Sequence, residues 1–282
     1  MVDRPEPAAL RGDVFEREET VAAWDDDYYH PLAARYYDRA LPDMLTAMGV
    51  RPGDLVLDAG CGPGVHSIRA ARFGAKVKAI DVSSVMLAHA RARAERAGVS
   101  AMIDFAKDDL TKLSLEPGAF SFIFSWGVLI HVPDAMSALD HLARSAAPGG
   151  KLALHILAKD SLDDMIEQGL RRLLRKPLKN LEETPLGRGN WYDFNGERLW
   201  VQRFDIGKLE RVMAERDLRL VGRRGAEFSE FQRRAPKLLR PLLLLANRLA
   251  YDLRLPAALF CTQIVIFEKP PERRNRIDGS AP

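Results

Sequence analysis

Glycines and a carboxylate spaced for binding a nucleotide-like ligand stand in the first half of the chain. Residues 56–64 read Val-Leu-Asp-Ala-Gly-Cys-Gly-Pro-Gly and continue an apolar run that favours a β-strand. Glycines at alternate positions after a strand let the backbone turn sharply and approach a ligand closely where a helix begins. The stretch therefore predicts a binding loop, with Gly60, Cys61, Gly62 and Gly64 beside the ligand.

The charge of that ligand is indicated by Asp58, two residues ahead of the first glycine. A pyrophosphate would be repelled by this carboxylate, whereas a ligand with an ammonium and a sulfonium would be attracted. The nicotinamide-dinucleotide fingerprint also needs a glycine where Val65 stands. S-adenosylmethionine (SAM) fits this pattern, and a tight turn without a ligand, or a dehydrogenase, remains the alternative.

Two further sets of acids follow the next two apolar runs. Asp81 stands 23 residues after Asp58 at the end of a predicted strand, where a carboxylate can hold both ribose hydroxyls. Asp108 and Asp109 follow the third predicted strand, where a carboxylate can accept a hydrogen bond from an adenine amino group. Each acid alone could be a solvated loop residue, but strand ends of a parallel sheet share one edge. We therefore expect a nucleoside site that includes Asp81, Val82, Asp108, Asp109 and Leu110.

The order of apolar and amphipathic segments predicts an α/β fold. Expected strands are 55–59, 77–80, 102–106, 120–124 and 151–157, and expected helices are 65–73, 83–97 and 135–147. Alternation of this kind with short links predicts a mostly parallel sheet with helices on both faces. Ahead of it we expect an aromatic-rich helical stretch at 21–48. Beyond it we expect a helix at 161–175, a hairpin around Asn195-Gly196, a helix at 206–216, a strand at 218–223, a helix at 236–253 and a strand at 260–268.

One domain is expected over residues 21–269, with flexible ends at 1–20 and 270–282. Its core would span residues 50–157, with a substrate-side insertion at 161–205 and a leucine-rich insertion at 229–256.

Residues 50–157 resemble the SAM-binding core of class I methyltransferases, especially the small-molecule group that includes the ubiquinone and menaquinone methyltransferases. The motifs that carry the resemblance are residues 56–64, 79–83 (Ala-Ile-Asp-Val-Ser), 107–110 (Lys-Asp-Asp-Leu), 125–134 (Ser-Trp-Gly-Val-Leu-Ile-His-Val-Pro-Asp) and 148–152 (Pro-Gly-Gly-Lys-Leu). The resemblance implies a Rossmann-like seven-stranded sheet of order 3-2-1-4-5-7-6. It also implies that Asp81 holds the ribose, Asp108 the adenine and the Gly60–Gly64 loop the methionine part, with Ser125 and Trp126 at the same cofactor site.

The sequence departs from the family at two positions. Ser121 stands where many relatives carry an acid, and Ile130 stands where the ubiquinone group has a glutamate before the histidine. A carboxylate or metal role there is therefore not expected, and no metal ligands are predicted. The Asn/Asp-Pro-Pro-aromatic motif of enzymes that methylate adenine in nucleic acid is absent after the fourth strand, so no nucleic-acid partner is predicted.

His131, near the end of the fourth strand, is the candidate general base, because an imidazole titrates near neutrality. A role in capping the next turn is equally compatible with its position. His155, inside the fifth strand, is expected to be a core or pocket-wall residue.

The acceptor site is expected in the segments added to the core. Aromatic walls suit a planar or lipid-like acceptor. The candidates are Tyr28, Tyr29, Trp191, Tyr192, Phe194 and Trp200, with His155. The alternative for each aromatic residue is that it only packs its segment onto the core. The leucine-rich helix within 236–254 is expected to be buried or a lid, with a dimer contact or a membrane-surface helix as alternatives.

Bulk composition excludes several classes of protein. The 282 residues carry a formal net charge of +3, too small to indicate nucleic acid, and Cys61 and Cys261 form neither a zinc motif nor a disulfide framework. Residues 1–20 lack the apolar segment of a secretory signal, so a cytoplasmic location is expected. The function predicted is methyl transfer to an O, N or C atom of a small or lipid-like molecule, by a monomer or homodimer. The alternatives are a silent SAM-binding protein or another SAM-using enzyme.

Overall fold

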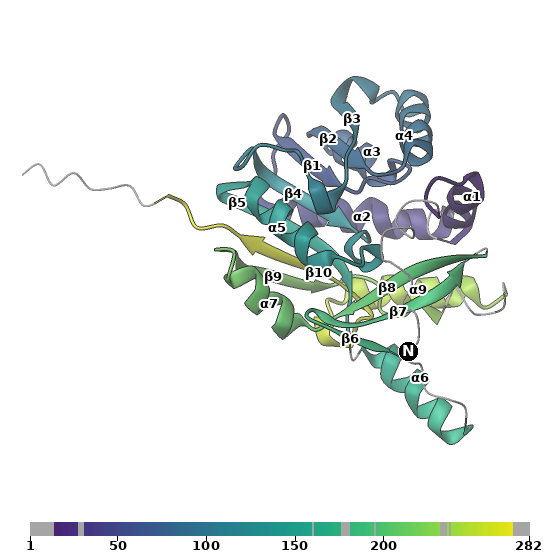
Figure 1. The fold of residues 1–282 in the computed structure, drawn as a ribbon. Helices are drawn as coiled ribbons and strands as arrows, with labels where there is room; N and C mark the ends of the chain where they lie inside the picture. Colours follow the sequence, from purple (N-terminus) through teal and green to yellow (C-terminus); the bar gives the residue numbers. More distant parts are fainter. Residues whose placement is uncertain are drawn as a thin grey trace, which may run out of the picture.

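A computed structural model describes residues 14–27, 31–159, 161–175, 181–194, 196–231, 236 and 238–272. Its centre is a seven-stranded sheet of order β3-β2-β1-β4-β5-β10-β9 (Figure 1). The strands are β1 (Leu55–Ala59), β2 (Lys76–Asp81), β3 (Ile103–Lys107), β4 (Phe120–Trp126), β5 (Ala146–Leu157), β9 (Arg219–Gly225) and β10 (Thr262–Glu268). β1 to β5 pair in parallel, and β10 runs antiparallel to both β5 and β9. The predicted α/β fold and strand order are confirmed.

Helices cover both faces of the sheet because each central strand alternates its apolar side chains between two cores. The helices are α1 (Glu18–Asp27), α2 (Pro31–Met48), α3 (Val65–Phe73), α4 (Ser84–Arg96), α5 (Ala135–Ser145), α6 (Leu162–Leu173), α7 (Ile206–Ala214) and α9 (Arg240–Asp252). Val56 of β1 packs with Leu41 and Leu45 of α2 on one face. Its neighbour Leu57 packs with Leu139 of α5 on the other face. This period of two makes β1 a fully covered strand.

Short 3-10 turns connect several of these elements. They are η2 (Ser100–Met102), η3 (Leu110–Lys112), η4 (Leu129–His131) and η5 (Ala257–Leu259). Local capping residues set the helix ends as the sequence indicates. The Ser83 hydroxyl accepts a hydrogen bond from the Met86 amide at the start of α4, and Gly74 ends α3 with a φ of 104°.

The predicted hairpin is present and longer than expected. β7 (Gly187–Phe194) and β8 (Glu197–Phe204) pair with Trp191 opposite Trp200, and β6 (Glu182–Thr184) adds a third strand. Phe204 is fully buried in the core on the α5 face. The hairpin is therefore anchored to the domain through its base.

The expected burial of the leucine-rich helix holds for only part of it: Leu244 packs against the core, but several of the other leucines are exposed. Leu242, Leu249 and Leu253 are 64, 51 and 70% exposed, while the buried face of α9 consists of Asn247, Ala250 and Tyr251. α6 likewise exposes Leu170 and Leu173 and projects from the body of the molecule in Figure 1. Neither helix reaches the length and apolarity that a bilayer crossing needs, and nor does any other helix in the described part of the chain.

Candidate active site

A deep cavity opens at the carboxyl ends of the parallel strands, where such sheets bind ligands. Its empty space, including the solvent-facing mouth, is about 1410 Å³. The predicted residues that line it are Asp58, Gly60, Cys61, Gly62, Asp81, Val82, Asp108, Asp109, Leu110, Trp126, His131 and His155. Chain folding thus brings together residues from the ends of five strands.

The glycine loop fits closely between β2 and the segment after β4. The amides of Gly60 and Cys61 both donate to the Ile80 carbonyl, at 2.9 and 2.8 Å. Gly60 has a φ of +87°, and a Cβ there would lie 2.4 Å from Cγ1 of Val128. Only glycine satisfies both the conformation and the close approach at this position.

Gly64, the last glycine of the loop, lies where α3 and α4 approach each other. It lies outside the cavity lining, and a Cβ on it would stand 2.7 Å from the Ala90 Cβ of α4. It therefore allows α3 and α4 to pack closely.

Asp58 lies buried beneath the loop, with 1% of its surface exposed. The Ser67 hydroxyl of α3 donates to its Oδ2 at 2.5 Å. Burial raises the pKa of Asp58 to about 7, the nearby Asp81 carboxylate adds to the rise, and the Ser67 hydrogen bond opposes it. A positive charge in the cavity would favour the ionised form of this group.

Asp81 is oriented by the backbone on both sides. Its Oδ2 accepts from the Gly62 amide at 2.8 Å and its Oδ1 from the Ser83 amide at 2.9 Å. Burial raises its pKa although these hydrogen bonds oppose the rise. Each carboxylate oxygen has a second acceptor position, so a pair of ribose hydroxyls can still be held.

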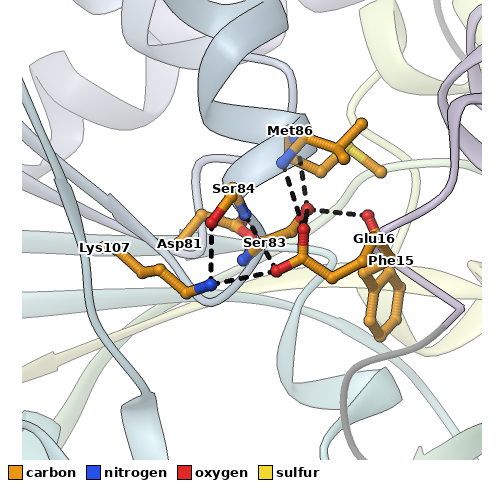
Figure 2. Close-up of polar contacts among 8 residues, drawn as sticks. Phe15, Glu16, Asp81, Ser83, Ser84, Met86 and Lys107 are labelled. Atoms are coloured by element: carbon orange, nitrogen blue, oxygen red, sulfur yellow. Dashed lines mark hydrogen bonds and ion pairs between the residues drawn. The ribbon is translucent and has the colours of Figure 1, made fainter.

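A segment ahead of α1 is bound to the start of α4 and to Lys107, as Figure 2 shows. The Ser83 hydroxyl donates to the Phe15 carbonyl at 2.7 Å, and the Phe15 side chain lines the cavity. Glu16 accepts from the amides of Ser84 and Val85 at the start of α4 and from Lys107 Nζ. Partial burial raises the pKa of Glu16, but these hydrogen bonds outweigh it and leave the pKa below its ordinary value. We call residues 14–17 the N-terminal strap.

The acids after β3 are held by their own loop. Asp108 accepts from the Asp109 amide and from the Ser114 hydroxyl, and Asp109 caps η3 by accepting from Thr111. Both carboxylates line the cavity. Their positions are fixed locally, as expected for acids that directly follow a strand.

His131 lies in η4 at the cavity wall. Its Nδ1 is 2.9 Å from the Trp200 carbonyl, which can only accept, so Nδ1 carries the hydrogen. The neutral ring then presents Nε2 as an acceptor. The Trp24 ring stacks on His131 with centroids 5.8 Å apart, and Phe15 of the strap lies 6.2 Å away.

Aromatic rings and a carboxylate form the other half of the cavity. Trp126 stacks between His66 and His155, at centroid distances of 4.7 and 4.6 Å. Burial, with smaller contributions from Arg69 and His155, holds the pKa of His66 well below its ordinary value, so His66 is neutral. Glu227, 6% exposed, accepts from the Tyr37 hydroxyl at 2.8 Å.

The remaining predicted site residues that the structure describes lie outside the cavity lining. Ser125 is buried and donates to the Ala59 carbonyl, which ties β4 to β1. In the hairpin, Trp191 packs on Trp200 and on the Arg198 guanidinium, and neither Tyr192 nor Phe194 reaches the lining. Trp191 and Trp200 thus stack on each other, and the Trp200 carbonyl bonds to His131 at the cavity wall, while the part of these aromatic residues in binding an acceptor stays a prediction. Tyr28 and Tyr29 lie outside the described residues.

Sequence reasoning missed Glu227, Glu230, Thr262 and Phe15, all of which line the cavity. The feature of the sequence that could have indicated Glu227 is its place two residues after β9, which ends at Gly225. The sequence does not indicate that a residue following β9, a strand at the edge of the sheet, reaches the cavity. Trp24 and Tyr37, from the predicted N-terminal aromatic stretch, do line it.

Comparison with known sequences agrees with this geometry. Residues 56–150 match the family described as a methyltransferase domain. A ubiquinone biosynthesis O-methyltransferase of Xanthomonas campestris is 33% identical over 144 residues, 46% of this chain and 59% of that protein. A methyltransferase of Streptomyces halstedii is 32% identical over 144 residues, 50% of this chain and 52% of that protein. The chain thus spans less than two thirds of these relatives.

Solved structures share the fold. Magnesium protoporphyrin IX methyltransferase from Synechocystis, crystallised with S-adenosylhomocysteine, superposes with a TM-score of 0.60 at 19% identity, over 91% of this chain and 97% of that one. The [4+2]-cyclase SpnF superposes with a TM-score of 0.55 at 18% identity, over 83% of this chain and 81% of that one. Residues 56–150 thus match a methyltransferase domain, and the strand order and loop geometry agree with the fold of class I SAM-dependent methyltransferases.

Proposed function

We propose that this chain transfers the methyl group of SAM to a small-molecule or lipid-like acceptor. The observation that carries the proposal is the arrangement of Asp58, Asp81 and Asp108 around the glycine loop at one sheet edge. No lysine or arginine occurs among the described residues of the lining. Such a cavity fits a cationic sulfonium and repels a pyrophosphate.

The residues around the glycine loop then each have a role in binding SAM. The Asp81 carboxylate would accept from the ribose hydroxyls, and Asp108 or Asp109 from the adenine amino group. Asp58 would compensate the ammonium of the methionine part from beneath the loop. The N-terminal strap would exclude water above the ribose, since Phe15 lines the cavity there.

The cofactor, when bound, supplies an electrophilic methyl group on sulfur. The chain's contribution is alignment and exclusion of water, because an in-line displacement depends mainly on the placement of its reactants. His131 Nε2 is the candidate acceptor of a proton from an acceptor hydroxyl, with Nδ1 fixed on the Trp200 carbonyl.

Two alternatives share this fold. The first is a SAM-binding protein that transfers nothing, and the second is a different SAM-using reaction. The similarity to a [4+2]-cyclase is the observation that favours the second, because it places another chemistry on the same architecture.

A peripheral contact with an anionic membrane surface is part of the proposal. Residues 171–179 carry five basic and no acidic residues, and residues 231–254 carry six basic and one acidic. Both segments accompany exposed leucines, such as Leu173 of α6 and Leu242 of α9. The two helices are joined at residues 229 and 230, since Asn247 of α9 binds the Ser229 amide and Asp163 of α6 binds the Glu230 amide. Leucines beside arginines suit the interface of an anionic lipid layer.

The remaining expectations stay proposals. We propose one domain over residues 21–269, a reducing cytoplasmic location in keeping with two buried cysteine thiols, and a monomer or homodimer.

The test has two stages. Calorimetry should show roughly micromolar binding of SAM and S-adenosylhomocysteine and none of NAD. Methyl-labelled SAM should then label a component of small-molecule or lipid extracts. Binding of NAD without SAM would overturn the cofactor assignment, and SAM binding without any transfer would favour the silent protein.

A further inference from the structure

A groove between α2 and α9 forms a second hollow in the molecule, apart from the cavity. Arg35 and Arg39 of α2 and Arg248 of α9 line it, together with Tyr36 and Tyr251. Its space, including the open side, is about 750 Å³. Three guanidinium groups from two helices thus converge on one part of the surface.

Buried aromatic residues hold the two sides of the groove together. The rings of Tyr36 and Tyr251 pack edge to face with centroids 5.3 Å apart. The Arg224 guanidinium lies 4.0 Å from the centre of the Tyr251 ring, and the Tyr251 hydroxyl donates to Asp43 at 2.9 Å. The helices that carry the arginines are therefore held at a fixed spacing.

The charges of the groove favour an anion. Asp252 is shared by two of the arginines, Arg39 at 2.7 Å and Arg248 at 3.7 Å. The other aspartate of the lining, Asp38, pairs with an arginine of α3 at 2.8 Å. Arg35 is exposed and makes no ion pair with another residue that the structure describes. Positive charge is therefore in excess over the two carboxylates.

Phosphate is the anion that best suits this arrangement. A guanidinium group binds phosphate oxygens through two parallel N–H donors, which a single carboxylate shared by two arginines does not fully use. Ion pairs between exposed side chains contribute little to stability. A phosphate can therefore take over donors of Arg39 and Arg248 at small cost.

An apolar face of α9 borders the groove. Its leucines recur every three or four residues and are between 49 and 70% exposed: Leu242, Leu245, Leu249 and Leu253. We call these four residues the leucine face. Helical spacing places Arg248 between the leucine face and the buried Tyr251. A hydrocarbon chain joined to an anion in the groove can therefore lie along the leucine face.

Resting on the lipid contact that accompanies the methyltransferase function proposed above, we propose that the groove binds the phosphate of an anionic phospholipid. The three arginines hold the phosphate diester, and the acyl chains lie on the leucine face. Tyr36 lines the groove and the next residue, Tyr37, lines the cavity, so α2 separates the two sites. A chain docked in this way keeps its cavity one helix away from the lipid layer.

A second copy of this chain fits the same face less well. A symmetric dimer brings identical patches of the two subunits together, so the two arginine grooves would face each other. Like charges at such a contact repel, whereas an anionic lipid layer attracts both the arginines and the leucines.

Vesicles test the site on the unaltered chain. The chain should bind vesicles in which about a third of the lipid is phosphatidylglycerol at least about tenfold more tightly than vesicles of phosphatidylcholine alone. Flotation measures both affinities. Equal binding to the two kinds of vesicle, or binding to neither, would overturn the inference.

Soluble probes distinguish a phospholipid from a free phosphate. Dihexanoylphosphatidylglycerol, kept below the concentration at which it forms micelles, carries both the headgroup and short acyl chains. Calorimetry should show that it binds at least about tenfold more tightly than glycerophosphoglycerol, its headgroup alone, or inorganic phosphate. Equal affinities would overturn the lipid assignment, because the leucine face would then contribute nothing.

A matched pair of variants tests the arginines. Arg35→Gln combined with Arg248→Gln removes two charges of the groove and keeps the 2.7 Å ion pair of Asp252. Its affinity for dihexanoylphosphatidylglycerol should fall at least about tenfold. The control, Arg72→Gln combined with Arg96→Gln, removes two exposed arginines of α3 and α4. Equal losses in the two proteins would mean a general attraction by net charge and would contradict a built site.

A second pair tests the leucine face. Leu249→Gln and the control Leu55→Gln replace leucines that are 51 and 48% exposed. Affinity for the anionic vesicles should fall at least about threefold for Leu249→Gln and stay within about twofold for Leu55→Gln. The same affinity in both variants would show that α9 does not enter the lipid layer.

The outcomes separate this site from the methyltransferase function. Loss of SAM binding by the unaltered chain would overturn that function and leaves the lipid measurements to decide the groove. Normal SAM binding and methyl transfer, with no preference for phosphatidylglycerol, would overturn the groove alone. If a variant loses its folded melting transition, the vesicles and soluble probes on the unaltered chain decide.

Discussion

The two halves of the cavity are held together over very different distances in sequence. In the cofactor half, Asp81 binds amides 2 and 19 residues away, and Asp109 binds an amide 2 residues away. In the half lined by Trp126, His155 and Glu227, the Tyr37 hydroxyl and its partner Glu227 are 190 residues apart. The first half is made by loops at strand ends, and the second by elements that meet only after the sheet is complete.

This difference indicates how substitutions should behave. A local loop can lose one carboxylate and keep its fold, because its backbone hydrogen bonds are made independently of the ligand. A contact across 190 residues links ligand binding to the packing of α2 against the sheet. Substitutions in the two halves should therefore separate cofactor affinity from acceptor affinity.

The largest expected effect is on the cofactor half. Asp81→Ala should weaken SAM binding about tenfold to a hundredfold (~1.5–3 kcal/mol), because two ribose hydroxyls lose a charged acceptor. Tyr37→Phe, in the other half, should leave the SAM Kd within about twofold. Calorimetry on both variants checks the separation, and equal losses would show that the halves are one coupled site.

The pH dependence of SAM binding should follow the ionisation of the Asp58 carboxyl. Its pKa of about 7 means that the carboxyl is largely protonated below that pH, and a cationic ligand favours the ionised form. SAM affinity should therefore rise about tenfold between pH 5.5 and 7.5 and level off above. Asp58→Asn should flatten most of this rise, leaving the smaller part that Asp81 contributes, and an unchanged profile would contradict the assignment.

A smaller effect is expected from the N-terminal strap. Glu16→Gln keeps the geometry but removes the charge bound by the start of α4 and by Lys107. The SAM Kd should rise about threefold to tenfold through faster release, as expected for a cap and an exposed ion pair. Glu18→Gln removes the neighbouring acid that pairs with His89 and serves as control. Identical release rates in stopped-flow measurements would show that the strap does not retain the cofactor.

The lowered pKa of Glu16 gives this contact a pH limit. Because the pKa of Glu16 is depressed in the folded protein, the contact stabilises the fold at pH values above the pKa of an ordinary glutamate. This stabilisation is lost as the pH falls through the pKa that Glu16 has in the folded protein. The contacts of Glu16 that hold the N-terminal strap should therefore weaken only at acidic pH, where Glu16 becomes protonated. This loss has a different cause from the rise of SAM affinity with pH, which follows the ionisation of Asp58.

The smallest effect is expected in the hairpin. Trp191→Ala removes a ring that packs on Trp200 and Arg198 away from the cavity. Methyl transfer should stay within about twofold, with a lowered melting temperature from the lost packing. A tenfold loss of transfer at an unchanged melting temperature would show that the hairpin closes over the acceptor after all.

Sequence alone determined the features that depend on neighbours in the chain. Alternation of apolar side chains gave the strands and helices, Gly60 marked the turn, and Asp58, Asp81 and Asp108 marked strand ends, because strand ends of a parallel sheet share one edge. Glycine conformation and helix capping are likewise local effects.

Tertiary structure alone decided the half of the cavity lined by Trp126, His155 and Glu227. Glu227 reaches the cavity because β9 is the edge strand beside β10, and Tyr37 meets it because α2 packs across the sheet. The sequence predicts the aromatic residues of the hairpin as pocket walls. In a pair of antiparallel strands, however, aromatic side chains opposite each other can pack together, as Trp191 and Trp200 do. Side-chain direction across such long separations follows from packing, which the periodicity of a single segment does not encode.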